Sequence, residues 1–404
     1  MKTFSKSAKL DRVSYDIRGP VQKEALRMEA EGIKVIKLNI GNPGAFGFNA
    51  PDKIISDIVE NVRNAQGYGH SRGIVAAREA VMKDFKKKGV EVGMDDIFIG
   101  NGASELIMIS MQSLLNPGDE VLVPMPDYPL WTAAVTFSGG TAVHYLCDEA
   151  NDWNPDLKDM RSKVSDKTKA IVVINPNNPT GAVYSRETLQ EIASIAKDRG
   201  LIVFADEIYT RILYDGAKHI PMSTIDPDIL TISFDGLSKA YLASGFRAGW
   251  MVISGNKKTA SGYFEGLDLL ASMRLCPNML SQLGIKAALD DAESIGPLLL
   301  PNGRLLEQRD ITVEMVNKIP GLSVVKPKGS LYCFPKIDTQ RFNIKSDEQF
   351  VMDFLREYQV LFVHGTGFNW KAPDHFRIVF LPDKAMLSDA LGRLGKFLEN
   401  YRQS

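Results

Sequence analysis

Short apolar segments alternate with longer helical patterns through the middle of the chain, and this alternation limits the folds that the chain can adopt. Several short segments are apolar at consecutive positions, which is typical of strands buried on both faces. The expected strands are residues 97–99, 120–123, 142–146, 170–174, 201–205, 229–234 and 249–253. Helical spacing marks residues 104–115, 130–137 and 186–199, with Ser104 and Ser185 expected as N-caps. The pattern predicts an α/β fold in which helices cover both faces of one mostly parallel, seven-stranded sheet.

The pattern changes after residue 301. Expected helices at residues 304–319, 346–357 and 384–401 alternate with short candidate strands at residues 322–325, 332–334, 360–363 and 375–379. This favours a smaller α+β domain. The first 45 or so residues contain an amphipathic stretch at 22–31 but no strand of the large sheet. We therefore expect three parts: residues 1–48, packing with the small domain, residues 49–301 as the large domain, and residues 302–404 as the small domain.

Composition excludes several classes of protein. The 404 residues carry a formal net charge of -1, so no basic field points to nucleic acid or to an anionic membrane. No run approaches the roughly 18 apolar residues of a membrane span, and the polar N-terminus does not resemble a signal peptide. The three cysteines, Cys147, Cys276 and Cys333, lie far apart without metal-ligand spacing. We expect a cytoplasmic protein without a metal, whose partners are small molecules or a second copy of itself.

Three polar segments each follow an expected strand. The segment at 175–181 (Asn-Pro-Asn-Asn-Pro-Thr-Gly) is a turn pattern, and the segment at 205–209 (Ala-Asp-Glu-Ile-Tyr) places Asp206 and Tyr209 three residues apart. The segment at 236–247 holds Lys239 beside a hydroxyl, two glycines and an arginine, which suits a Schiff-base nucleophile next to an anion site. Each has an ordinary alternative: a simple turn, an N-cap aspartate and a solvated surface lysine.

Taken together and in this order, these segments resemble the class I aminotransferases of fold type I, which use pyridoxal 5'-phosphate. The resemblance runs from about Arg18 to about Arg377. Residues 15–20, 38–43, 175–181 and 272–276 are most similar to the bacterial alanine aminotransferases. The resemblance implies a homodimer with a shared active site. It also implies an enzyme that moves an amino group between an L-amino acid and a 2-oxo acid in a ping-pong cycle. The implied substrate pair is glutamate with pyruvate.

The resemblance also implies roles for residues around the cofactor ring. Lys239 is the lysine that binds the cofactor covalently and moves the proton at the substrate α-carbon. Asp206 holds the pyridine nitrogen protonated, because the ring accepts electrons well only when that nitrogen is cationic. Tyr209 and Asn178 hydrogen-bond the phenolic oxygen of the ring, and Tyr128 stacks on the ring.

The cofactor phosphate requires donors, and the resemblance places them in three segments. Backbone amides at the start of a helix face the anion, and Ser238 and Arg247 add a hydroxyl and a guanidinium. The helix start consists of Gly102, Ala103 and Ser104. Tyr68 matches the tyrosine that reaches the phosphate of the neighbouring subunit, although a local loop role is the alternative. Gly236 departs from the family, which often has serine three residues before the lysine, and this leaves Ser238 as the nearest hydroxyl.

Substrate binding falls to other residues. The resemblance implies that Arg377 binds the substrate α-carboxylate and that Gly41 and Asn178 complete that site. The distal carboxylate of glutamate requires a second cation, for which Arg18 and Arg274 are candidates, or else structural ion-pair partners.

Three other functions fit parts of the same pattern. An aromatic or broad-specificity aminotransferase, or a β-eliminating lyase acting on cysteine conjugates, would use the same cofactor. A non-enzymatic regulator that senses the cofactor would need a DNA-binding module, and the chain has no spare basic domain for one.

Overall fold

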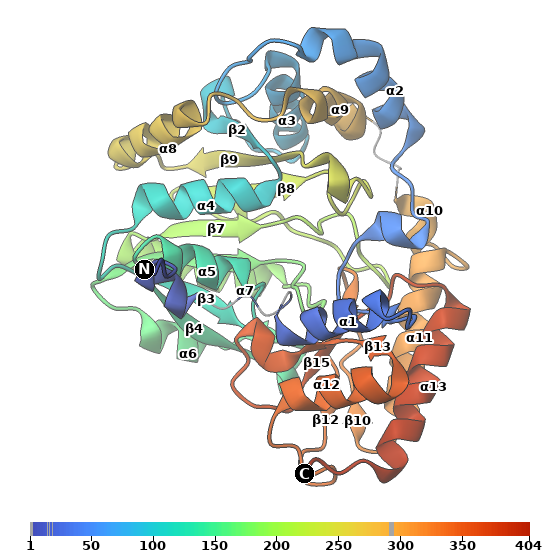
Figure 1. Ribbon diagram of the computed structural model, residues 1–404. Helices are drawn as coiled ribbons and strands as arrows, with labels where there is room; N and C mark the ends of the chain where they lie inside the picture. Colours follow the sequence, from blue (N-terminus) through green and yellow to red (C-terminus); the bar gives the residue numbers. More distant parts are fainter. Residues whose placement is uncertain (1–2, 14, 16, 18, 291–294) are drawn as a thin grey trace.

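A computed structural model describes residues 3–13, 15, 17, 19–290 and 295–404 of the chain. Its centre is an eight-stranded sheet in the order β2-β9-β8-β7-β6-β3-β4-β5 (Figure 1). The strands are β2 (Ile97–Gly100), β3 (Glu120–Met125), β4 (Thr141–Asp148), β5 (Asn154–Pro155), β6 (Thr168–Ile174), β7 (Ile202–Asp206), β8 (Leu230–Gly236) and β9 (Gly249–Gly255). The pairs from β4 through β3, β6 and β7 to β8 are parallel, whereas β9 is antiparallel to both β8 and β2.

The predicted α/β fold and its seven strands are confirmed, but the predicted strand count is one short. The additional strand, β5, has two residues and pairs antiparallel with the end of β4. A two-residue Asn-Pro strand is too short to produce an apolar pattern in the sequence. The strands β6 and β8 are buried along almost their whole length, as their consecutive apolar residues predicted.

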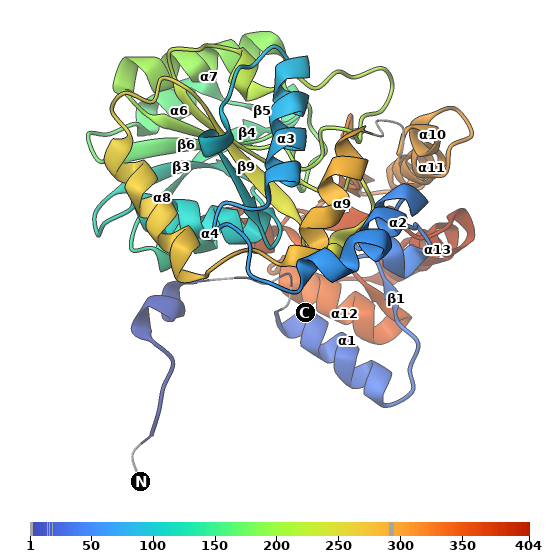
Figure 2. The same ribbon diagram turned by 90° about the horizontal axis from the view of Figure 1, so that it is seen from above.

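Helices cover both faces of the sheet (Figure 2). One face packs against α4 (Ala103–Leu114), α5 (Leu130–Phe137) and α8 (Ser261–Met273). The other packs against α6 (Leu157–Lys163) and α7 (Arg186–Arg199) and, near β2 and β9, against α3 (Val75–Lys87) and α9 (Met279–Asp290). Ser185 caps α7 by accepting from the Thr188 amide, as expected. Ser104 is not an N-cap: the N-cap of α4 is Gly102, whose φ of 82° only glycine adopts readily.

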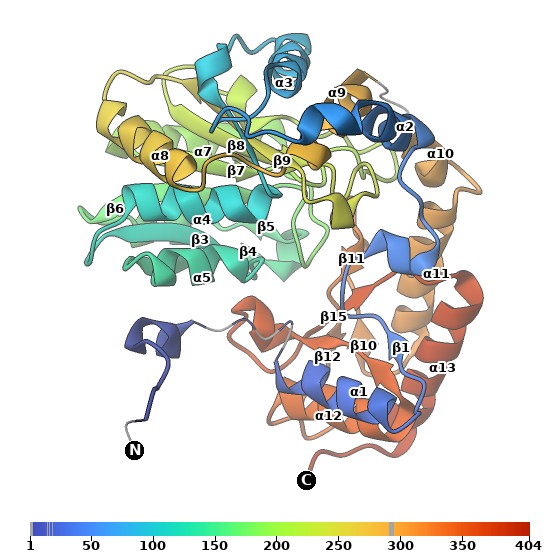
Figure 3. The ribbon, with the colours of Figure 1, turned by 45° about the horizontal axis from the view of Figure 1, so that its top comes forward.

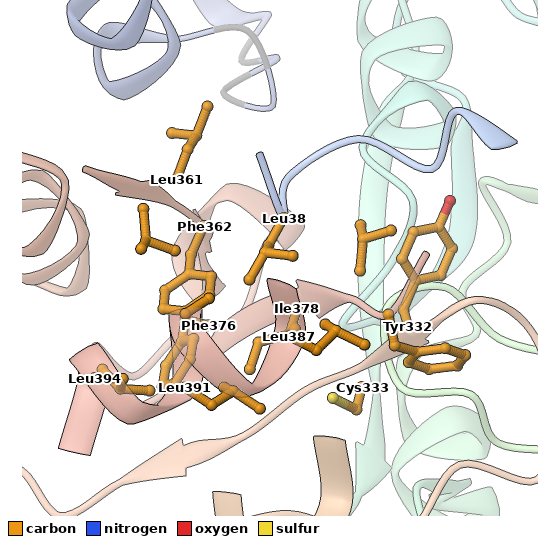
Figure 4. Close-up of a cluster of buried hydrophobic side chains, with 14 of the residues drawn as sticks. Leu38, Tyr332, Cys333, Leu361, Phe362, Phe376, Ile378, Leu387, Leu391 and Leu394 are labelled. Carbon is orange, nitrogen blue, oxygen red and sulfur yellow. The ribbon is translucent and has the colours of Figure 1, made fainter. Parts of the chain in front are cut away.

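The C-terminal part contains α11 (Arg304–Lys318), α12 (Asp347–Tyr358) and α13 (Lys384–Asn400) around short strands. These strands are β10 (Leu322–Ser323), β11 (Tyr332–Cys333), β12 (Lys336–Ile337), β13 (Val360–Leu361), β14 (Val363–His364) and β15 (Phe376–Val379). Their apolar side chains form a separate core, and Tyr332 lies at one edge of it (Figure 4). The helix α10 (Gly296–Leu299) precedes α11.

The N-terminal segment packs with this C-terminal part. It contains α1 (Pro20–Ala30), which contacts α12, and β1 (Ile36–Lys37), which pairs in parallel with β13. The helix α2 (Asp52–Asn61) then leads to the large sheet and packs against α9 (Figure 3). The 3-10 helices are η1 (Ala8–Arg12), η3 (Pro43–Phe46), η4 (Val62–Ala65), η5 (Met94–Asp96), η6 (Glu149–Asn151), η7 (Met222–Thr224), η8 (Ser244–Phe246) and η9 (Gly365–Phe368). The domain boundaries at residues 48 and 301 stay predictions.

Among the described residues, no helix has both the length and the apolar character that crossing a bilayer requires.

Candidate active site

A cavity of about 570 Å³ lies where the carboxyl ends of β6, β7 and β8 meet the start of α4. This is the edge at which ligands bind in open parallel sheets. Most of the residues singled out from the sequence line it together: Gly41, Ala103, Ser104, Tyr128, Asn178, Asp206, Tyr209, Ser238, Lys239, Arg247 and Arg377. The three polar segments thus meet at one place because each follows one of three neighbouring strands.

Asp206 forms one side of the cavity as a buried carboxylate. The residue is 4% exposed, and burial raises its pKa to about 6. Its Oδ2 accepts a hydrogen bond from Trp131 Nε1 at 2.9 Å, and its Oδ1 is 3.4 Å from the amide of Ile208. Among the described residues no lysine, arginine or histidine forms an ion pair with it. A buried carboxylate without a counter-ion is a place for a cationic partner.

Arg377, on β15, is a buried cation in the same cavity, and the residue is 1% exposed. Its Nη1 donates to Asn178 Oδ1 at 2.9 Å and its Nη2 to the carbonyl of Asn39, while Nε has no hydrogen-bond partner among the described residues. Burial lowers its pKa. The rings of Tyr332 and Phe368 lie 4.3 and 4.5 Å from the guanidinium carbon. Because no described carboxylate neutralises it, the guanidinium suits an anionic ligand.

Lys239 lies in the same cavity, in the turn that follows β8. Its Nζ donates to the carbonyl of Gly41 at 2.5 Å. Tyr209 donates its hydroxyl proton to Tyr332 at 2.9 Å, and burial raises the pKa of Tyr209 well above its ordinary value. Burial also raises the pKa of Tyr332, but the charges of Lys239 and Arg377 outweigh it and lower that pKa overall. A Cβ atom at Gly41 would overlap the Tyr332 hydroxyl, so only glycine fits there.

The start of α4 and the turn after β8 meet at one corner of the cavity, which is suited to an anion. Arg247 donates to the Ser244 carbonyl at 3.0 Å and to the Asn101 carbonyl at 3.2 Å, and its Nη1 lies 3.4 Å from Ser238 Oγ. Among the described residues it has no carboxylate partner. Gly102 does not line the cavity, but a side chain there would overlap the Arg247 guanidinium. Amides of a helix start beside an unpaired arginine favour a phosphate group.

The glycine that departs from the family pattern has a structural cause. Gly236 pairs with Gly249 across β8 and β9. A Cβ atom at Gly236 would come within 2.7 Å of the Ala248 carbonyl, and one at Gly249 would lie 2.8 Å from the Gly102 carbonyl carbon. Gly249 therefore lets the start of α4 approach the sheet closely, whereas Gly236 leaves room for the backbone of Ala248 and Gly249. The hydroxyl-bearing residues of the segment after β8 that line the cavity are Ser238 and Ser244.

Besides Gly102, two described residues named from the sequence do not line this cavity. Tyr68 is 84% exposed and lies outside it. Arg274 lies outside it as well, because its guanidinium pairs with Glu105 and donates to the carbonyls of Ser71 and Ile99. This placement matches the alternative of a structural ion pair. Arg18 falls outside the described residues.

Sequence reasoning missed several residues that the structure brings to the site. Tyr15 lines the cavity, and its hydroxyl lies 2.9 Å from that of Tyr128. Tyr332 contacts both Tyr209 and Arg377, and Trp131 holds Asp206. The only available signals were the position of Tyr15 within a family-like segment and the position of Trp131 three residues after Tyr128. Tyr332 lies 93 residues from Lys239 and gave no signal.

Pyridoxal 5'-phosphate fits the charges and donors of this cavity. Its pyridine nitrogen, when protonated, would meet the unpaired carboxylate of Asp206. Its phosphate would meet the amides of Ala103 and Ser104 and the guanidinium of Arg247. Its aldehyde carbon requires a primary amine, and Lys239 supplies one.

Comparison with known proteins agrees with the geometry. The model of the family described as aminotransferase class I and II matches residues 33–394. The chain therefore belongs to this family, whose class I members use pyridoxal phosphate.

Similar proteins include several named alanine aminotransferases. The chain is 58% identical to the glutamate-pyruvate aminotransferase AlaA of Haemophilus influenzae and 57% identical to that of Escherichia coli K12, over the whole of both chains in each case. It is 54% identical to the alanine aminotransferase of Mycobacterium tuberculosis H37Rv, over 100% of this chain and 94% of the relative.

Solved structures of aminotransferases have the same fold as this chain. An aminotransferase from Escherichia coli superposes with a TM-score of 0.99 at 57% identity, covering 100% of both chains. The alanine aminotransferase of Pyrococcus furiosus superposes with a TM-score of 0.93 at 40% identity, covering 98% of this chain and 100% of the other.

Proposed function

We propose that this protein is a homodimeric alanine aminotransferase that interconverts L-alanine plus 2-oxoglutarate and pyruvate plus L-glutamate. The observation that carries the proposal is the pair of buried, unneutralised charges, Asp206 and Arg377, that share one cavity with Lys239. The Asp206 carboxylate would bind a cationic ring nitrogen, and the Arg377 guanidinium would bind a substrate carboxylate. The relatives named above, at 54 to 58% identity over the whole chain, support the choice of substrates.

Residues of five segments would hold the cofactor. Asp206 would bind the ring nitrogen, and Tyr128 would lie against the ring. Tyr209 and Asn178, which both line the cavity, would donate to the phenolic oxygen. The phosphate-binding residues would be Ala103 and Ser104 at the start of α4, supported by Gly102, together with Ser238 and Arg247.

Amino transfer requires proton movement at the substrate α-carbon. When bound, pyridoxal 5'-phosphate stabilises the negative charge that develops on that carbon. Arg377 binds the α-carboxylate with its planar donor fork, and Asn178 fixes one arm of the guanidinium through the 2.9 Å hydrogen bond to Nη1. Lys239 Nζ takes the proton from the α-carbon and returns one later in the cycle. Gly41 leaves room for the Tyr332 hydroxyl, which any side chain there would overlap, and so keeps Tyr332 at the edge of the substrate site.

The distal carboxylate of glutamate needs a further cation. Arg274 is engaged with Glu105, so we favour Arg18 for this role. Replacing Arg18 with glutamine should raise the KM for glutamate and 2-oxoglutarate but leave the KM for alanine within about twofold, because alanine has no second carboxylate. An equal rise for alanine would refute the assignment.

An exposed apolar surface supports the dimer. The helix α2 packs against α9 (Figure 3). A Cβ atom at Gly69 would touch Met279 at the start of α9, and α8 ends at Met273, shortly before α9 begins. The exposed side chains are Val59, Val62, Tyr68, Leu269, Met273, Leu275 and Leu280. Exposed apolar side chains that lie on neighbouring elements are typical of association sites. Tyr68 would then enter the cavity of the second copy rather than its own.

Hybrid dimers test this arrangement. Lys239→Ala and Tyr68→Ala homodimers, each impaired alone, are denatured together and refolded. If Tyr68 acts across the dimer, one site in each hybrid regains both residues, and roughly a quarter of wild-type activity should return. If Tyr68 acts within its own chain, mixing restores nothing.

Steady-state assays test the reaction. Pyruvate formation from alanine plus 2-oxoglutarate should exceed oxo-acid formation from tyrosine plus 2-oxoglutarate by at least about a hundredfold in kcat/KM. Release of pyruvate and ammonia from cystathionine should stay at background. A dominant tyrosine activity would favour an aromatic aminotransferase, and ammonia release would favour a β-lyase. The cytoplasmic location of the protein stays a prediction.

A further inference from the structure

Asp206 has a single side-chain donor among the described residues, the indole of Trp131. Trp131 Nε1 donates to Asp206 Oδ2 at 2.9 Å, and both side chains are buried. The indole does not line the cavity, so it lies behind the carboxylate and leaves Oδ1 for a ligand. The amide of Ile208, at 3.4 Å from Oδ1, is a weak competitor for that atom.

The strands that present Asp206 also hold the indole. Phe204 precedes Asp206 by two residues on β7, and Phe234 is the residue opposite Asp206 on β8. The rings of Phe204 and Phe234 lie 6.0 and 5.3 Å from that of Trp131, the second edge to face. The amide of Trp131 donates to the carbonyl of Tyr128 at 3.0 Å, which links the indole to the residue expected against the cofactor ring. The indole therefore has little freedom to turn away from Asp206.

An indole has a chemical advantage in this position. Its N–H donates but cannot accept, and unlike imidazole it does not titrate near neutral pH. A donor of this kind stabilises the ionised form of a carboxylate without adding a charge of its own. The bond opposes the effect of burial, which raises the pKa of Asp206.

We propose that Trp131 is a positioning residue that holds Asp206 ionised and oriented toward the cofactor ring nitrogen. This inference rests on the proposed function, because it assigns Trp131 a role toward the same cofactor. Its effect on the reaction passes entirely through Asp206.

The test compares holoenzyme variants by cofactor binding and by absorption. Trp131→Phe keeps an aromatic ring but removes the donor. Trp250→Phe is the matched control, because Trp250 is also buried and its Nε1 has no hydrogen-bond partner among the described residues. The dissociation constant of the cofactor and the pH midpoint of its absorption spectrum are measured for both variants, for Asp206→Asn and for the Trp131→Phe, Asp206→Asn double variant.

We expect Trp131→Phe to weaken cofactor binding about tenfold and to move the spectral midpoint by about one pH unit, while Trp250→Phe changes neither. In the Asp206→Asn background, Trp131→Phe should change binding by less than about twofold, because the two residues act as a unit. A folded Trp131→Phe protein with wild-type binding and midpoint overturns the inference, and so does an undiminished effect in the Asp206→Asn background.

A second variant keeps the test decisive if Trp131→Phe does not fold. Trp131→His retains one ring N–H and should add a titration near the ordinary histidine pKa of about 6.5 to the cofactor spectrum. A spectrum with the pH dependence of the wild type contradicts the inference. A wild-type protein that binds no cofactor would instead refute the proposed function.

Discussion

Replacing Arg377 with lysine tests the substrate-binding part of the proposal. The change keeps the positive charge but removes the planar fork whose arms reach Asn178 and the carbonyl of Asn39. An ammonium group cannot make both of these bonds and also bind a carboxylate in two-point fashion. One charge-assisted hydrogen bond contributes about 1.5 to 3 kcal/mol. Since 1.4 kcal/mol corresponds to a factor of ten, the KM should rise roughly 10- to 150-fold.

The rise should be the same for alanine and for 2-oxoglutarate, because both carry the α-carboxylate. The kcat should change by less than about fivefold, since the carboxylate is bound alike before and during proton transfer. Arg309→Lys is the control: Arg309 is equally buried but is paired with Asp215 at 2.8 and 2.9 Å, away from the cavity. It should lower the melting temperature and leave both KM values unchanged. An unchanged KM in Arg377→Lys, or a rise for one substrate only, would refute the assignment.

Three further predictions concern the cofactor corner, a buried histidine and the buried carboxylate. Gly102→Ala should weaken cofactor binding at least about tenfold in equilibrium dialysis, because the alanine side chain would overlap Arg247. Gly118 has a similar positive φ but open space around it, so the control Gly118→Ala should affect stability alone. His375 lies between Asp374 at 2.7 Å and Glu149 at 3.3 Å, with Lys336 near both carboxylates; burial lowers its pKa, but the two carboxylates outweigh this and raise it overall. The contribution of protonated His375 to folding stability is therefore complete below a pH of about 6.5 and is lost as the pH rises through the raised pKa. His375→Gln should lower the melting temperature most at acidic pH. A difference in melting temperature from the wild type that stays constant from a pH of about 5 to about 9 would contradict this. Burial raises the pKa of Asp206 from 3.8 to about 6, so the ionised carboxylate destabilises the cofactor-free protein above that pH. Asp206→Asn should therefore raise the free energy of unfolding of the cofactor-free protein at pH 8 by up to about 3 kcal/mol, measured by urea unfolding. Below a pH of about 4 it should bring no gain.

The sequence predicted most of the large sheet because its strands are buried on both faces and so leave consecutive apolar residues. It did not reveal β5, whose two residues pair only with the edge of β4. Ser104 was misplaced as an N-cap because the requirement at that turn is a positive φ, met by Gly102, rather than a side-chain acceptor.

The lining of the cavity was predictable where a residue follows a strand in a recognisable segment. Lys239, Asp206 and Asn178 all do so, and their meeting follows from the order of β6, β7 and β8. The supporting residues were not predictable. Trp131 and Tyr332 reach the site through helix packing and through the contact between the two parts of the chain, and neither leaves a local pattern. The engagement of Arg274 with Glu105 also depends on a contact across 169 residues.

A single-turnover experiment tests the central claim most directly. Holoenzyme is mixed with alanine in the absence of any oxo acid, and pyruvate and ammonia are measured together with the cofactor spectrum. The account predicts about one pyruvate per active site, no ammonia, a spectral change reversed by 2-oxoglutarate, and no pyruvate from Lys239→Ala. Pyruvate accompanied by free ammonia, or an equal yield from Lys239→Ala, would contradict it.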